Sequence, residues 1–428
     1  MKKIKLNVVN ENLYYEKIEN GLEIYLIKKE NFNTSYACFC TNFGGIDVEF
    51  IPINEKEYVK MPSGIAHFLE HKLFEQKNGE SVHDFYKKSG TYVNAFTNYK
   101  YTKYIFNGAN NFINNLDYLL DYVQDPYFTD ENVLKEKGII LEEAYMVMDN
   151  PDRLFNSTIM KNIYNEIPYY NTVIGSIEDI KSITKEDLYR CYYSFYHPSN
   201  MALLIVTNED EKEVINRIKE NQSKKEFKKD FIINKKEYIE KENVKKEKEI
   251  IKGNALENRL CYSIKMPLSK LNCSLIEAYD YFSILFGILI GNLSKYNLDL
   301  KEKNIIKDNI FYSISSDKAK NETYVIFKIF ALTEKYDYFI NSLEKILSSK
   351  DYNEELFNLY KKTFISDLNY MFNTVNGTMN FMMMEYDFYK KISNDIIDFE
   401  TNLNYERFIE VTNNLSLKNK SIVIMEKK

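Results

Sequence analysis

The stretch His67-Phe68-Leu69-Glu70-His71 decides how this chain is interpreted. The chain has only four histidines among its 428 residues, and two of them stand four positions apart here. Residues at i and i+4 share one face of a helix, so two imidazole nitrogens can reach a single metal ion. Glu70 projects close to that face, where it is placed to act on a metal-coordinated water rather than to hold the metal. This order, H-x-x-E-H, is the reverse of the commoner H-E-x-x-H zinc helix.

The flanking residues predict where this helix begins and ends. Pro62 and Ser63 stand where the chain should enter it, with Ser63 as a candidate N-cap. Gly79 follows the apolar residues of the helix, in the place where a C-cap glycine is expected. The alternative is a surface helix with two unrelated histidines. In that case the spacing of His67, Glu70 and His71 would be a coincidence.

A catalytic zinc needs three protein ligands and one open position. The segment from Thr129 to Asn150 is predicted to form a second long helix, closed by Pro151. Within it, Glu136 and Glu143 lie seven residues apart, which is two helical turns, so they share a face. On spacing alone, the solvated surface of a helix is the better explanation of these glutamates.

Three segments, in this order, resemble the pitrilysin/insulinase family of inverzincin metallopeptidases, which includes the mitochondrial processing peptidases: 64–75 (GIAHFLEHKLFE), 94–97 (NAFT) and 136–143 (EKGIILEE). The resemblance implies that His67, His71 and Glu143 bind one Zn²⁺ per chain and that Glu70 is the general base. It also implies that Glu136 is a carboxylate that steadies a ligand histidine. Glu142 is the nearest competitor to Glu143, and the seven-residue offset from Glu136 favours Glu143.

The same resemblance suggests how a substrate would be held. In the family, the strand that matches Asn94-Ala95-Phe96 accepts the peptide substrate as an added β-strand. This implies a main-chain role for Ala95 and side-chain roles for Asn94 and Phe96. From the residues alone, an ordinary strand is an equally good interpretation.

One family feature is missing from the second half. Many active members carry an Arg followed seven residues later by a Tyr, and Lys301 and Asp308 stand at these positions here. A lysine lacks the planar bidentate fork of an arginine. We therefore expect the chain to work with a partner, either a homologous zinc-less subunit that supplies the pair or a second copy of itself.

The order of predicted elements divides the chain into two similar halves. Residues 1–224 are predicted to form a zinc-bearing α+β domain, 225–246 a charged linker, and 247–428 a homologous α+β domain without a metal site. Each domain is expected to be a mostly antiparallel sheet with helices packed on one face, and the two to enclose a cavity.

Composition narrows the function further. The net charge of −6 and the mixing of lysines with glutamates argue against nucleic acid as a partner. The longest apolar run, near 284–290, is too short to span a bilayer, so no membrane association is expected. The five cysteines are scattered and include no CxxC pair, which is typical of reduced thiols. The N-terminal residues lack the apolar core of a signal peptide. Both observations predict a cytoplasmic location.

These inferences favour a zinc endopeptidase that hydrolyses short or unfolded peptides with metal-activated water. The alternative is a non-catalytic or weakly active scaffold or peptide-binding subunit of a processing complex.

Overall fold

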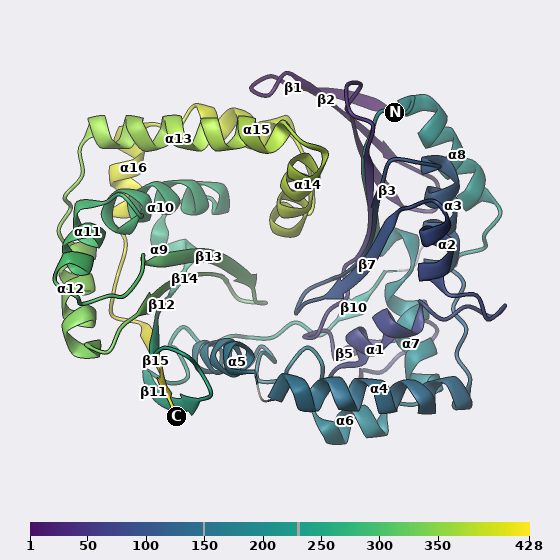
Figure 1. The fold of residues 1–428 in the computed structure, drawn as a ribbon, viewed down its shortest axis with the longest axis horizontal. Helices are drawn as coiled ribbons and strands as arrows, with labels where there is room; N and C mark the ends of the chain where they lie inside the picture. The colour runs from purple at the N-terminus through teal and green to yellow at the C-terminus, as the bar shows by residue number, and fades with distance from the viewer. Residues whose placement is uncertain (149, 229–231) are drawn as a thin grey trace. The chain divides into compact units, whose positions relative to one another are not determined.

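The structure is a computed structural model that describes residues 1–148, 150–228 and 232–428 (Figure 1). The chain forms two compact units. Unit 1 comprises residues 1–144, 171–236 and 368–397, and unit 2 comprises residues 145–170, 237–367 and 398–428.

Unit 1 contains a seven-stranded sheet in the order β1-β2-β3-β9-β4-β8-β7. The pair β3–β9 is parallel and the other neighbours are antiparallel. Strands β5, β6 and β10 form a separate small sheet. The strands are β1 (Lys2–Leu6), β2 (Glu11–Lys17), β3 (Glu23–Lys28), β4 (Ser35–Thr41), β5 (Glu49–Ile51), β6 (Val59–Lys60), β7 (Tyr92–Thr97), β8 (Thr102–Gly108), β9 (Met201–Thr207) and β10 (Asn234–Lys235).

Unit 2 contains a five-stranded sheet in the order β11-β15-β12-β14-β13. Here β11–β15 is the parallel pair and the other neighbours are antiparallel. The strands are β11 (Lys248–Gly253), β12 (Arg259–Pro267), β13 (Phe311–Lys318), β14 (Thr323–Leu332) and β15 (Lys420–Lys427). The prediction of mostly antiparallel sheets is confirmed for both units.

The helices follow the same order in both halves of the chain. After β4 and the two short strands β5 and β6 come α1, α2, β7, β8, α3 and α4. After β12 and the one-turn helix α9 come α10, α11, β13, β14, α12 and α13. The predicted repetition of one α+β fold is thus confirmed. The helices are α1 (Ile65–Lys72), α2 (Val82–Lys88), α3 (Phe112–Val123), α4 (Asp130–Met148), α5 (Pro151–Ile163), α6 (Ile177–Ser182), α7 (Lys185–Phe195), α8 (Glu211–Ser223), α9 (Leu268–Leu271), α10 (Leu275–Ile290), α11 (Lys295–Glu302), α12 (Tyr336–Ser348), α13 (Glu354–Phe372), α14 (Val375–Tyr389), α15 (Asn394–Thr401) and α16 (Tyr405–Thr412), with a 3₁₀ turn at Pro198–Asn200.

Each unit also receives a helix from the other half of the sequence. In unit 1, α3 and α8 lie on one side of the sheet and α14 lies on the other, where it packs on β4 and β9 (Figure 1). In unit 2, α5 packs on β11, β12 and β15. Every residue of β4 and β9 is buried, as in strands that are covered on both faces. Unit 1 therefore has a helix on its second face that the sequence did not predict.

The segment 225–246 is mostly exposed where the structure describes it, but two parts of it contact the rest of the chain. Strand β10 pairs with β5, and Glu240 is only 2% exposed. Residues 229–231 lie outside the described residues. The boundary between the two units falls within this segment, after residue 236. The units also differ from the predicted ranges 1–224 and 247–428. Helix α5 belongs to unit 2 and helix α14 to unit 1, because each helix belongs to the unit on which it packs.

The stretch 275–302 has the length and mean hydropathy of a membrane span. It consists of two helices, α10 and α11, and 67% of its apolar window is buried inside the structure. Core helices of soluble proteins have these same properties.

Candidate metal centre

Helix α1 begins at a glycine rather than at the predicted serine cap. Gly64 is the N-cap residue, with a φ of 86°, and the helix has no side-chain cap. A Cβ atom on Gly64 would lie 2.2 Å from the carbonyl oxygen of Ile174, so only glycine fits this close approach. The Ser63 hydroxyl instead bonds to Asp179. The prediction of Ser63 as N-cap is therefore wrong.

The predicted C-terminal end of α1 is also wrong. The helix ends at Lys72 with Leu73 as its C-cap, and Gly79 lies in the following turn, with a φ of 76°. Both errors concern the ends of the helix, and the spacing of its histidines is unaffected.

Three ligand atoms from α1 and α4 converge in unit 1. The Nε2 atoms of His67 and His71 lie 3.7 and 3.5 Å from Oε2 of Glu143. All three atoms lie within 4.8 Å of one another. Ligand atoms around a tetrahedral zinc with bonds of about 2.0–2.1 Å are about 3.3 Å apart. The two histidine–glutamate distances are within a few tenths of an ångström of this value, so the residues present fit a zinc ion. Glu142 is exposed and lies outside the group.

Glu136 holds the second of these histidines in place. Its Oε1 lies 3.0 Å from Nδ1 of His71, and both side chains are partly buried. Because a carboxylate only accepts hydrogen bonds, Nδ1 carries the proton and the Nε2 lone pair is available to a metal. Burial lowers the pKa of His71, but Glu136, Glu70 and Glu143 outweigh it and raise the pKa overall. The site attracts a positive charge.

A buried lysine ties the two helices of the site together. Lys72, the last residue of α1, is fully buried and forms an ion pair with Glu75. Its ammonium group also donates to the carbonyl oxygen of Asn132, near the start of α4, at 3.4 Å. The second of these contacts links the end of α1 to the start of α4.

Glu70 lies beside the ligand group in a buried position. Its side chain is 9% exposed, and burial raises its pKa above the ordinary value for a glutamate. The charge of Glu143 acts in the same direction, while Thr97 and His71 oppose it. A buried carboxylate with a raised pKa is typical of a general base.

A cavity of about 500 Å³ adjoins the ligand group. Asn94 and Ala95 of β7 line it together with Glu70, His71 and Glu136. Phe96 is 37% exposed and is not among the lining residues. The structure thus brings two of the three predicted substrate residues to the cavity.

His83 belongs to the same cavity, although it lies outside the three segments that resemble the family. Its ring stacks on Phe74, with centroids 5.0 Å apart, and both rings line the cavity. His83 is exposed, and it follows α1 closely enough to return to the site across the turn at Gly79. No signal in its own segment indicated this placement.

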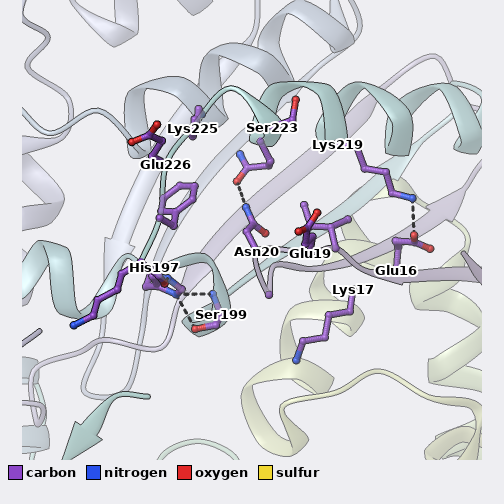
Figure 2. A pocket seen from close by; sticks show the side chains of 15 residues that line it. Glu16, Lys17, Glu19, Asn20, His197, Ser199, Lys219, Ser223, Lys225 and Glu226 are labelled. Atoms are coloured by element: carbon purple, nitrogen blue, oxygen red, sulfur yellow. Dashed lines mark hydrogen bonds and ion pairs between the residues drawn. The ribbon is translucent and has the colours of Figure 1, made fainter. Parts of the chain in front are cut away.

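The remaining histidine has a local structural role. His197 lies in a larger cavity formed by the β2–β3 turn and the end of α8 (Figure 2). Its Nδ1 accepts from the main-chain N–H of Ser199, and its Nε2 lies 2.8 Å from the carbonyl oxygen of Lys228. It caps the short 3₁₀ turn that precedes β9.

The residues at the family's Arg–Tyr positions have local partners in unit 2. The Lys301 ammonium group donates to Oδ1 of Asn309 at 3.0 Å, and Asp308 accepts from the main-chain N–H of Asn309 at 2.7 Å. In the neighbouring helix α10, Glu277 pairs with Arg407 at 2.7 Å.

The duplicated α+β units and the H-x-x-E-H group point to a family of peptidases. The family model for insulinase (peptidase family M16) matches residues 53–176, and the model for the peptidase M16 inactive domain matches residues 182–364. The uncharacterised zinc protease YmfH of Bacillus subtilis is 40% identical over 318 residues, which cover 74% of each chain. This chain belongs to the peptidase M16 (insulinase) family.

Further comparisons agree with this assignment. An Arabidopsis thaliana protein named as the beta subunit of the mitochondrial-processing peptidase is 27% identical over 161 residues, 37% of this chain and 30% of that one. An M16-like peptidase from Alicyclobacillus acidocaldarius has the same fold, with a TM-score of 0.87 and 27% identity over 98% of this chain and 99% of that chain. A protease from Helicobacter pylori shares the fold with a TM-score of 0.78 at 17% identity, over 97% and 99% of the two chains.

Proposed function

We propose that this chain is a zinc-dependent endopeptidase that hydrolyses short or unfolded peptides. The observation that carries the proposal is the convergence of His67, His71 and Glu143, with the buried Glu70 beside them. We also propose a cytoplasmic location, which the five free cysteines support.

Each residue of the site has a defined task in this reaction. Zinc, when bound by the two histidines and Glu143, would polarise the scissile carbonyl and make a coordinated water more acidic. Glu70 takes the proton of the attacking water and delivers it to the leaving amine. Glu136 keeps the His71 ring in the tautomer and orientation that metal binding needs. No covalent bond between chain and substrate is required.

The position of β7 supports a strand-like mode of peptide binding. Within the described residues, β7 pairs with β8 on one side and forms the edge of its sheet. An extended peptide added at this edge would run along the cavity lined by Asn94 and Ala95, beside Glu70. Main-chain hydrogen bonds would supply affinity with little dependence on the peptide sequence.

Zinc content tests the ligand assignment. We expect one zinc ion per purified chain by elemental analysis, and Glu143→Gln should weaken zinc binding by more than about 100-fold, because it removes a direct ligand. Glu142→Gln is the matched control, since it removes the same charge from the adjacent exposed position. Equal zinc loss in both variants, or none in either, would show that Glu143 is not a ligand.

We further propose that a homologous chain completes the site, because Lys301 and Asp308 stand in place of the Arg–Tyr pair. Mixing the purified chain with a homologous zinc-less subunit should raise peptide cleavage by 10-fold or more, given the bidentate contact that Lys301 cannot make. Full activity of the chain alone would end this proposal. Zinc and peptide binding without cleavage, alone or mixed, would instead favour the alternative of a non-catalytic peptide-binding subunit.

A further inference from the structure

The carboxylate of Glu70 is held by the last residue of β7. The Thr97 hydroxyl donates a hydrogen bond to Oε2 of Glu70 at 2.6 Å, and the Thr97 main-chain N–H also interacts with this carboxylate. Both donors come from one residue, so they restrain the carboxylate from one side. Thr97 lies outside the ligand group. It ends the 94–97 segment that resembles the family, but only the other three residues of that segment were assigned roles from the sequence.

The direction of this hydrogen bond follows from the chemistry of the two groups. An ionised carboxylate can only accept, and a threonine hydroxyl has a single proton. Thr97 therefore donates to Glu70. The Thr97 hydroxyl oxygen also lies 3.1 Å from that of Thr102, whose own proton is donated to the carbonyl oxygen of Phe43 at 3.0 Å. A hydrogen bond to a charged acceptor is stronger than one between neutral groups.

The surroundings of Thr97 keep its hydroxyl in place. Thr97 and Thr102 face each other in the β7–β8 register, and Thr102 is fully buried. The turn between the strands is closed by Asn98, whose Oδ1 accepts from the main-chain N–H groups of Lys100 and Tyr101 at 2.7 and 2.9 Å. The hydroxyl is thus attached to a short, hydrogen-bonded hairpin end rather than to a loop.

We propose that Thr97 is a positioning residue that fixes the orientation of Glu70 for proton transfer. The bond to Oε2 opposes rotation of the carboxylate and so keeps it in one orientation. This inference rests on the proposed peptidase function. A side chain of similar shape without the hydroxyl would still fill the space, but it would leave Glu70 in several orientations, of which only some are productive.

A pair of substitutions at position 97 separates positioning from packing. Thr97→Val keeps the shape and removes the donor, and Thr97→Ser keeps the donor. We expect Thr97→Val to lower kcat for peptide cleavage by about 10- to 100-fold, the effect of one hydrogen bond to a charged group. KM and zinc content should stay within about 2-fold, and Thr97→Ser should recover most of kcat. Unchanged kcat in Thr97→Val, or equal losses in both variants, would overturn the proposal.

A second measurement does not depend on activity. Crystal structures of the metal-free wild type and of Thr97→Val should show one Glu70 conformation in the wild type and a rotated or multiply placed carboxylate in the variant. An unchanged Glu70 in Thr97→Val would overturn the positioning role. If the wild type cleaves no peptide, the proposed function fails, and these two structures still decide whether Thr97 orients Glu70.

Discussion

Replacing Glu70 by glutamine is expected to lower peptide cleavage by about 10²- to 10⁴-fold while zinc stays bound. The amide has nearly the shape of the carboxylate, so the cavity and the ligand residues keep their arrangement. It cannot accept the proton of the attacking water, so the step assigned to Glu70 is lost. The measurement is kcat for a fluorogenic peptide, together with zinc content by elemental analysis.

The same substitution has an expected effect on stability. Burial raises the pKa of Glu70, which means that the folded protein bears a penalty for the ionised side chain. The neutral amide avoids this penalty, so the melting temperature of Glu70→Gln should equal or exceed that of the wild type.

Glu80→Gln is the control for both measurements, because Glu80 lines the same cavity but is exposed. Activity within 10-fold of the wild type in Glu70→Gln would exclude Glu70 as the base.

Replacing Glu240 by glutamine is expected to lower the free energy of unfolding by about 3–5 kcal/mol. Glu240 and Lys265 form an ion pair at 2.7 Å in unit 2, and both side chains are fully buried. Glu240 also accepts from the main-chain N–H groups of Asn165, Glu166 and Ile167 at 2.8 to 3.0 Å. The variant would leave the Lys265 ammonium group buried without its counter-charge.

The pH dependence of this effect has a definite sign. Burial raises the pKa of Glu240, but the Lys265 contact and the three main-chain donors outweigh it, so the pKa lies below the ordinary value of 4.5. A lowered carboxyl pKa stabilises the folded state above the unfolded pKa, and this stabilisation is lost as the pH falls through the folded pKa. The difference between wild type and Glu240→Gln should therefore be full at pH 7 and shrink below about pH 4.5.

Urea unfolding at pH 7 and pH 4 measures both expectations. Glu242→Gln is the matched control, because Glu242 is 47% exposed and pairs with the exposed Lys270, so its loss should change stability by less than about 1 kcal/mol. The double variant Glu240→Leu/Lys265→Met should recover much of the lost stability, since an apolar pair needs no counter-charge. Equal effects of Glu240→Gln and Glu242→Gln would show that the buried pair is not a major source of stability.

The segment around Glu240 contains a buried charge that its composition could not predict. Residues 225–246 are rich in lysine and glutamate, which predicted a charged linker, and most of the described residues of this segment are indeed exposed. In the structure, Glu240 is buried because Lys265 and three main-chain N–H groups in distant parts of the chain compensate its charge. Composition reports the average polarity of a segment, whereas burial of a single charge depends on partners that are remote in sequence.

The predictions of where α1 begins and ends were wrong for a related reason. Ser63 is a good N-cap residue by type, but the approach of Gly64 to Ile174 sets where α1 begins. The extent of the longer helix was predicted more reliably: α4 runs from Asp130 to Met148, within the predicted segment from Thr129 to Asn150. Periodic apolar positions are a property of the segment itself, while caps depend on what the chain meets there.

The sequence by itself determined the local part of the metal site. The spacing of His67, Glu70 and His71 follows from the 3.6-residue helical period, and so does the shared face of Glu136 and Glu143. Only the tertiary structure decided that Oε2 of Glu143 meets both histidines, that Glu136 holds His71, and that Thr97 restrains Glu70. These contacts join residues that lie 27 to 76 positions apart, and packing between separate elements sets them rather than the backbone geometry of any one helix.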